Sequence, residues 1–115
     1  MVNTGETSIN KLIILFVFDK MESAISERTI LDMCSSSNEW MGYMDCVNVI
    51  HKLLDDNFIC VVSEDEDTLY TITPDGRETL ANFYIKIPKS VREEISQFVK
   101  KNSSRYRNKQ ECRSD

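Results

Sequence analysis

The sequence between residues 69 and 83, LYTITPDGRETLANF, changes from a strand pattern to a helix pattern without an intervening loop. Residues 69–72 alternate apolar and polar side chains and are rich in β-forming residues, which predicts a strand. Next, Thr73 supplies an N-cap hydroxyl, Pro74 the favoured proline at the first helical position, and Asp75 an acid in the first turn. The fold of this chain must therefore let a strand pass directly into a helix.

The first helix expected before this junction runs from a Ser8 cap to about Met21. Its apolar side chains occupy nearly the whole circumference, and a helix of that kind must be buried on all sides. A chain of 115 residues can form only a small hydrophobic core. We therefore expect part of this helix to be covered by another subunit.

Two further helices are expected before the strands. Ser26 caps the second, over residues 27–34, and a turn cluster follows at residues 35–38. The third begins at Asp45 or slightly earlier and ends near residue 56. Its apolar positions recur at the i, i+3, i+4, i+7 spacing that is typical of one buried helix face.

A β-hairpin and two more helices complete the pattern. Asn57 is a plausible left-handed stop after the third helix. Residues 58–62 and 68–72 are rich in β-formers and flank a polar tip, which predicts a hairpin with a longer loop. A fourth helix is expected over residues 74–87, and a fifth from about Ser90.

The order helix, helix, helix, hairpin, helix predicts a mainly α, α+β domain of the winged helix-turn-helix type, with one or two C-terminal helices. The hairpin is then the wing, and its second strand leads into the helix that packs back on the first one. Gly76 is expected where a side chain would collide with a neighbouring element. We expect residues 1–7 to be flexible, residues 8–101 to form the domain, and residues 102–115 to be a basic, disordered tail.

Three segments resemble a bacterial winged-helix family known mainly as a domain of unknown function. They are INKLIILFVFDKM (residues 9–21), YTITPDGRETLANF (residues 70–83) and IPKSVREEISQFVKKN (residues 87–102). That family is distantly similar to transcriptional regulators of the PadR and MarR types. The resemblance implies a cytoplasmic, dimeric, DNA-binding domain with a regulatory role, and family members that continue beyond the position of Asp115.

Composition argues against several other classes of protein. The longest apolar run, residues 12–18, is too short to cross a membrane, and no signal-peptide cleavage site follows it, so we expect a cytoplasmic protein. There is no C-x-x-C motif and His51 is the only histidine, so neither a metal nor another cofactor is expected. No nucleophile and base are placed by a motif, so we expect no enzyme.

The cysteines are expected to be structural. Cys34, Cys46 and Cys60 are flanked by apolar residues, which is typical of small core side chains. Cys112 lies apart from them in the basic tail.

Charge is distributed unevenly along the chain. Residues 1–87 carry 6 basic and 15 acidic side chains, whereas residues 88–115 carry 8 basic and 4 acidic ones. A protein that grips phosphate backbones usually presents a basic face. Here that face could come only from the C-terminal end, where Tyr106 lies among the basic residues of the tail.

The helix-turn-helix hypothesis still points to specific DNA contacts, because the third helix would enter the major groove of duplex DNA. The candidate DNA-binding residues are Arg28, Tyr43, Asn48, His51 and Lys52. Asn48 could bond an adenine edge, and Lys52 could meet a phosphate or a guanine. The alternative is that all five are ordinary solvated side chains.

Two other binding functions stay open at this stage. The acidic hairpin tip, residues 64–67, could contact a basic protein partner, so that the module would bind protein and not DNA. The cluster of Trp40, Met41, Tyr43 and Met44 could line a small-molecule pocket, although such clusters are more often core or interface. A homodimer through the first and last helices is expected in either case.

Overall fold

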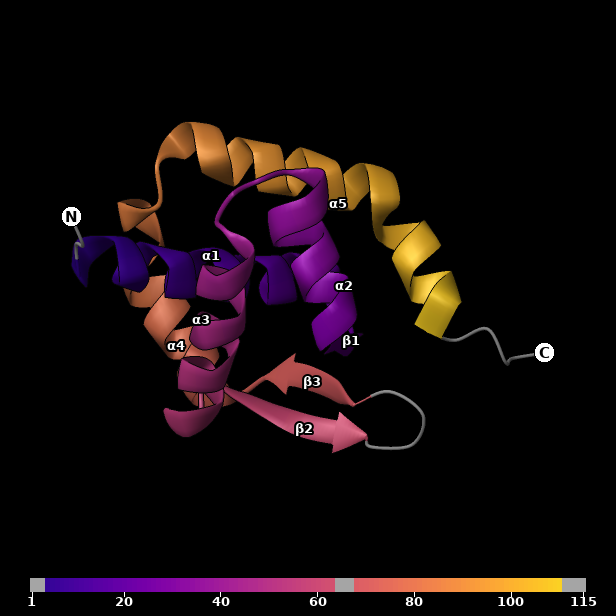
Figure 1. Ribbon diagram of the computed structural model, residues 1–115, viewed down its shortest axis with the longest axis horizontal. Coiled ribbons are helices and arrows are strands. Elements are labelled where there is room, and N and C mark those ends of the chain that lie inside the picture. The colour runs from indigo at the N-terminus through magenta and orange to yellow at the C-terminus, as the bar shows by residue number, and fades with distance from the viewer. Residues whose placement is uncertain (1–3, 64–67, 111–115) are drawn as a thin grey trace.

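Helix α1, Thr4–Met21, forms the centre of the molecule (Figure 1). The computed structural model describes residues 4–63 and 68–110, with side chains for residues 8–63 and 68–102. Residues 12–18 of α1 are all buried, with at most 8% of any side chain exposed. They are covered by α3 (Tyr43–Asp55), α4 (Pro74–Phe83), α5 (Lys89–Gln110) and strand β3 (Leu69–Ile72).

The expectation that a second subunit covers α1 was therefore wrong. Elements of the same chain pack around the helix on several sides, so its continuous apolar surface is used within one copy. Each fully buried apolar side chain of this size contributes about 1.5–3 kcal/mol to the free energy of unfolding. The helix also begins at Thr4, four residues before the expected Ser8 cap.

Helix α2, Glu27–Leu31, is shorter than expected and passes into a π-helical segment, η1, Asp32–Ser37. The Ser26 cap is confirmed, because its Oγ accepts a hydrogen bond from the Thr29 amide at 3.2 Å. The prediction of a turn at residues 35–38 was wrong, because the chain remains in the π-helix as far as Ser37. Asn38 ends that π-helix by donating from Nδ2 to the Met33 carbonyl at 2.8 Å.

Helix α3 begins at Tyr43 after a Gly42 cap and ends at Asp55. Its buried side chains are Cys46, Val49, Ile50 and Leu53, as the apolar spacing predicted. The left-handed stop at Asn57 is confirmed by its φ of 64°. The face of α3 away from these residues is left to solvent.

The strands form a three-stranded antiparallel sheet in the order β1-β3-β2. Strands β2 (Ile59–Ser63) and β3 make the expected hairpin, whose tip, residues 64–67, lies outside the described residues. Strand β1, Ile25–Ser26, was not expected, because two residues are too few to show an alternating pattern. It pairs Ile25 with Tyr70 and so ties the start of α2 to the hairpin.

The junction from β3 to α4 is built as the sequence indicated. Thr73 Oγ1 accepts a hydrogen bond from the Gly76 amide at 3.0 Å and donates one to the Asn57 carbonyl at 2.7 Å. A Cβ atom on Gly76 would overlap the Phe58 carbonyl oxygen and lie 2.9 Å from Ile72 Cγ1. The first turn of α4 therefore packs directly on the backbone at the start of the hairpin.

The C-terminal helices differ from expectation at their ends. Helix α4 stops at Phe83, and the 3-10 turn η2, Tyr84–Lys86, takes the place of its expected last turn. Helix α5 begins at Lys89 and continues to Gln110, beyond the expected end of the domain at residue 101. It lies along α1 (Figure 1).

The structure is thus a mainly helical α+β domain with one small antiparallel sheet. Within the described part of the chain, no helix is both long and apolar enough to span a membrane.

We predict that Gly76→Ala lowers the free energy of unfolding by about 2 kcal/mol or more, because the added methyl group must displace backbone. This loss outweighs the ~1 kcal/mol by which alanine is usually preferred over glycine inside a helix. Urea unfolding followed by circular dichroism measures it.

Gly42→Ala is the matched control, since its Cβ would meet only Asp45 Oδ2 at 3.6 Å, an ordinary contact. We expect a loss below about 1 kcal/mol there. Equal effects of the two substitutions would contradict the packing argument.

Candidate nucleic-acid interface

The solvent face of α3 carries three of the five residues that the sequence singled out. Asn48, His51 and Lys52 are all exposed and lie one helical turn apart or adjacent on that face. In the part of the chain that the structure describes, none of these three side chains has a hydrogen-bond or ion-pair partner that would fix its conformation. The face is thus free to meet a ligand, with Met44 and Asp55 exposed beside them.

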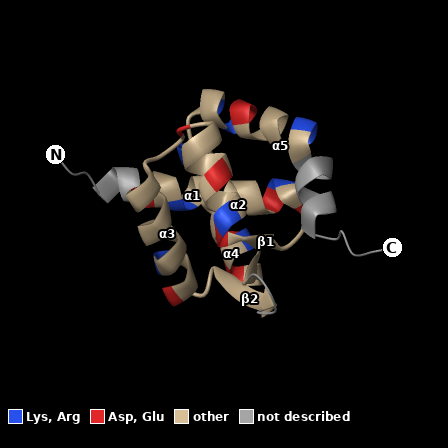
Figure 2. Cartoon of the chain, turned by 45° about the vertical axis from the view of Figure 1, so that its right-hand side comes forward, with Lys and Arg blue, Asp and Glu red and all other residues tan. Residues whose placement is uncertain are grey.

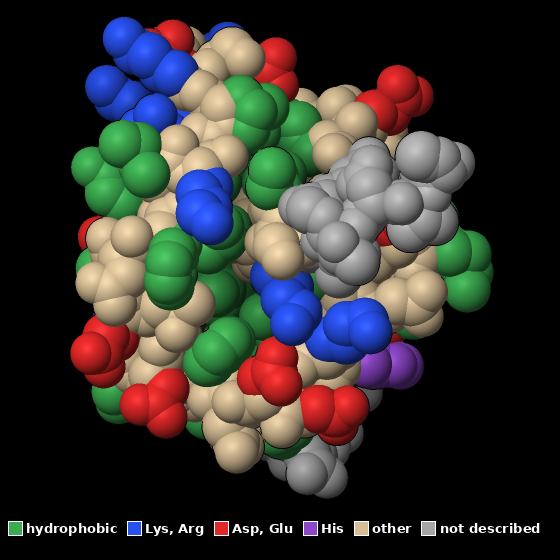
Figure 3. Space-filling view, turned by 90° about the vertical axis from the view of Figure 1, so that its left-hand side faces the viewer, with side chains coloured by type: hydrophobic (Ala, Val, Ile, Leu, Met, Phe, Trp, Pro, Cys, Tyr) green, Lys and Arg blue, Asp and Glu red, His purple; other side chains and the backbone are tan. Residues whose placement is uncertain are grey.

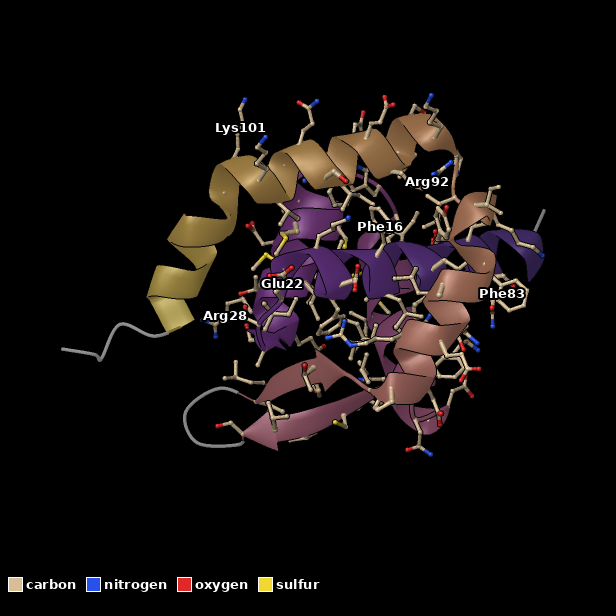
Figure 4. The ribbon with its side chains drawn as sticks, turned by 180° about the vertical axis from the view of Figure 1, so that it is seen from behind. Phe16, Glu22, Arg28, Phe83, Arg92 and Lys101 are labelled. Carbon is tan, nitrogen blue, oxygen red and sulfur yellow. The ribbon has the colours of Figure 1, made fainter. Side chains whose placement is uncertain are left out.

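The other two predicted residues, Arg28 and Tyr43, meet in a separate place. They line a hollow of about 490 Å³ between α2, the start of α3 and the hairpin. Arg28 lies on α2 at the hairpin side of the molecule (Figure 4). Tyr43 lies at the opposite end of α3 from Lys52, so the five residues form two groups on α2 and α3 and not a single cluster.

Tyr70 is a residue of this hollow that the sequence prediction missed. It lies on β3 opposite Ile25 and is nearly buried. Burial raises the pKa of the Tyr70 hydroxyl above its usual 10.0, and the negative charge of Glu27 raises it further. The phenol therefore stays protonated at neutral pH and can donate a hydrogen bond. The sequence signal that could have identified Tyr70 is an aromatic residue with a polar hydroxyl inside a strand of alternating apolar and polar residues.

The charge around α3 is unfavourable for phosphate. Arg28 and Lys52 are the basic residues of α2 and α3, whereas Glu27, Asp45 and Asp55 add negative charge on the same elements. Asp56, just after α3, is paired with Lys11 at 3.1 Å. Figure 2 shows the positions of Lys and Arg spread over α1, α2, α3 and α5, with positions of Asp and Glu among them.

The aromatic-methionine cluster before α3 does not form one pocket wall. Trp40 turns to α5, where its Nε1 donates to Glu94 Oε1 at 2.8 Å and its ring meets Phe98 edge-on at 6.0 Å. Met41 is buried in the core, whereas Met44 is 62% exposed. Trp40 therefore joins the η1–α3 connection to α5, which is a structural role.

The cysteines divide into buried and exposed positions. Cys34 and Cys46 are fully buried, as expected. The expectation for Cys60 was wrong, because it lies on the exposed face of β2. A hydrogen bond with Cys46, together with burial, raises the pKa of the Cys34 thiol, which disfavours a reactive thiolate.

Metal coordination has no cluster of ligands to support it in the described part of the chain. No three of its His, Cys, Asp and Glu side chains come together as metal ligands would. Cys112 lies outside the described residues.

Comparison with known families places the chain in one of them. Residues 10–115 match the family described as "Domain of unknown function (DUF4364)", and the chain belongs to that family. No curated protein and no solved structure matches it. Membership therefore supports the expected domain of unknown function and leaves similarity to PadR- or MarR-type regulators as a hypothesis.

We predict that Trp40→Phe lowers the free energy of unfolding by about 1–2 kcal/mol, because the phenyl ring is smaller and cannot donate to Glu94. Glu94→Gln is the control, since its side-chain oxygen still accepts the bond, and we expect a change within about 0.5 kcal/mol. Denaturant unfolding compares the two variants. A Trp40→Phe protein as stable as the wild type would show that this contact does not hold α5.

Proposed function

We propose that this protein is a winged-helix DNA-binding protein that acts as a transcriptional regulator in the cytoplasm. The observation that carries the proposal is the position of α3. One face of α3 is locked into the core, and the other presents Asn48, His51 and Lys52 to solvent beside a hairpin. The short strand β1 supports this interpretation, because it joins the α2 start to the hairpin as a three-stranded wing sheet would require.

The proposed mechanism is binding without chemistry. Lys52 on α3 and Arg28 on α2 would contact phosphates and set the register of the domain on the duplex. Asn48 would reach an adenine edge in the major groove, with His51 next to it. Tyr43 would lie near the backbone contact of Arg28, because both line the same hollow.

Because α2 and α3 carry few cations, the proposal predicts a weak dependence of DNA binding on salt concentration. The logarithm of the binding constant falls against the logarithm of salt concentration with a slope of about −0.9 per phosphate neutralised. Two contacts per chain therefore predict a shallow slope of roughly −2 per chain. A much steeper slope would mean that other basic residues form the footprint.

We predict that Arg28→Ala and Lys52→Ala each weaken binding to a mixed-sequence duplex about 3- to 10-fold and reduce the salt slope by about 1. Fluorescence anisotropy with a labelled duplex, at low and moderate salt, measures both quantities. Lys100→Ala removes the same charge from α5 and should leave binding unchanged. Absence of binding at low salt would refute the DNA-binding proposal.

A protein-interaction module is the second candidate, and exposed apolar side chains favour it. Met44 on α3 is 62% exposed and Ile85 on η2 is 71% exposed. Surface groups of this kind are enriched where proteins meet other proteins. The acidic hairpin tip that the sequence offered as the docking surface for a basic partner lies outside the described residues.

We also propose a homodimer, but with a different surface from the one the sequence indicated. Most of the apolar part of α1 is buried within its own chain, so α1 contributes little to that surface. Phe83, Tyr84 and Ile85 are exposed at the α4–η2 corner, next to α5. Beside them, Leu12, Leu15, Phe58 and Phe83 line an apolar hollow of about 250 Å³, on a face where Figure 3 shows apolar side chains gathered.

Light scattering is expected to give twice the chain mass of 13.3 kDa. Ile85→Asp should return the mass to that of one chain, because it places a charge in the proposed interface. Met44→Asp, at another well-exposed apolar position, on α3, should leave the dimer intact. A monomeric wild type would refute the homodimer.

A further inference from the structure

A third hollow, of about 380 Å³, lies between α1, η2 and the first half of α5. Its lining includes Phe16 and Lys20 of α1, Tyr84 of η2, and Lys89 and Arg92 of α5. Figure 4 shows Phe16 and Arg92 close together, on the side of the molecule seen from behind. No lining residue comes from α2, α3 or the sheet, so the hollow is separate from the candidate nucleic-acid interface.

Within the described part of the chain, the basic side chains of this hollow take part in no ion pair. Elsewhere, Lys11 pairs with Asp56 at 3.1 Å and Arg77 with Asp19 at 3.0 Å. Lys20, Lys89 and Arg92 have no carboxylate within ion-pair distance among the described side chains, although Glu93 also lines the hollow. Three cations and one acid leave an excess of positive charge around the opening.

Two of these cations are held in place over aromatic rings. Arg92 donates from Nε to the Ile87 carbonyl at 3.1 Å, and its guanidinium lies 5.3 Å from the centre of the Tyr84 ring. Lys20 Nζ lies 5.2 Å from the centre of the Phe16 ring. A long side chain that is already ordered by such contacts loses less conformational entropy when it binds a ligand. The positive groups are thus partly ordered before any ligand arrives.

We propose that this hollow binds a small organic anion with one phosphate or carboxylate head and a flat apolar body. Arg92, Lys20 and Lys89 bind the head, since guanidinium and ammonium groups donate charge-assisted hydrogen bonds to such oxygens. The exposed parts of Phe16 and Tyr84 contact the body. Ser96 and Gln97 add neutral hydrogen-bonding groups at the edge. The volume lies within the range usual for small-molecule sites.

The experiment is a titration of the ¹⁵N-labelled chain with phenyl phosphate, followed by amide and arginine side-chain NMR shifts. We expect saturable shifts at the Arg92 Nε–H and along residues 89–97 and 16–20. Benzoate tests a carboxylate head on the same body, and inorganic phosphate tests the head alone. Binding of phenyl phosphate at least about 10-fold tighter than inorganic phosphate is expected, which corresponds to ~1.4 kcal/mol from the apolar body.

The double variant Lys20→Ala/Lys89→Ala should weaken phenyl phosphate binding at least about tenfold. Both lysines are exposed, so the fold should persist, which circular dichroism verifies. Lys100→Ala/Lys101→Ala removes the same charge from α5 outside the hollow and should leave binding unchanged. Equal loss in both double variants would show general charge attraction and overturn the proposal.

Three other outcomes would also overturn it. The first is an absence of saturable shifts at tens of millimolar ligand, and the second is inorganic phosphate binding as tightly as phenyl phosphate. The third is displacement of phenyl phosphate by duplex DNA, which would make the hollow part of a nucleic-acid footprint. These results do not depend on whether α3 binds DNA, because the residues substituted in the two sites, Arg28 and Lys52 in one and Lys20 and Lys89 in the other, are different.

Discussion

The burial of residues 12–18 of α1 is the constraint on which the rest of this structure depends. A helix that is apolar around most of its circumference has to be covered on every side, and in this chain α3, α4, α5 and β3 provide the cover. Each covering helix is thereby oriented with one apolar stripe inward and one polar face outward. The solvent face of α3 and the hollow beside α5 are both consequences of packing around this single helix.

One carbonyl group links the hairpin to the first turn of α4. The Phe58 carbonyl accepts a hydrogen bond from the Thr73 amide at 3.0 Å and lies directly under Gly76. This contact holds the start of β2, the end of β3 and the first turn of α4 together. Because Phe58 follows α3 almost immediately, the same contact also determines where the hairpin stands relative to α3, and hence where any ligand of that face would meet the hairpin.

Electrostatics separates the two candidate binding regions. On α2 and α3, Arg28 and Lys52 are surrounded by acidic residues, so attraction for a polyanion is local and weak. Between α1 and α5, three cations border one apolar floor without carboxylate partners among the described side chains. Two separated cations on α2 and α3 suit contacts with the extended phosphate backbone of DNA. Three cations around one hollow suit a compact anionic ligand. Membership in the family of unknown function is compatible with both.

The sequence by itself determined the α+β class, the order of the five helices and the hairpin, the Ser26 and Thr73 caps, the Asn57 stop and the role of Gly76. These features depend on neighbours within a few residues, where spacing and capping act directly. Strand β1 depended on pairing with β3, far along the chain, and the exposure of Cys60 depended on which face of the hairpin packs on the core. The tertiary structure alone decided that α1 is covered by its own chain, that Arg28 meets Tyr43, and that Lys20, Lys89 and Arg92 converge, because each result requires helices to pack in three dimensions.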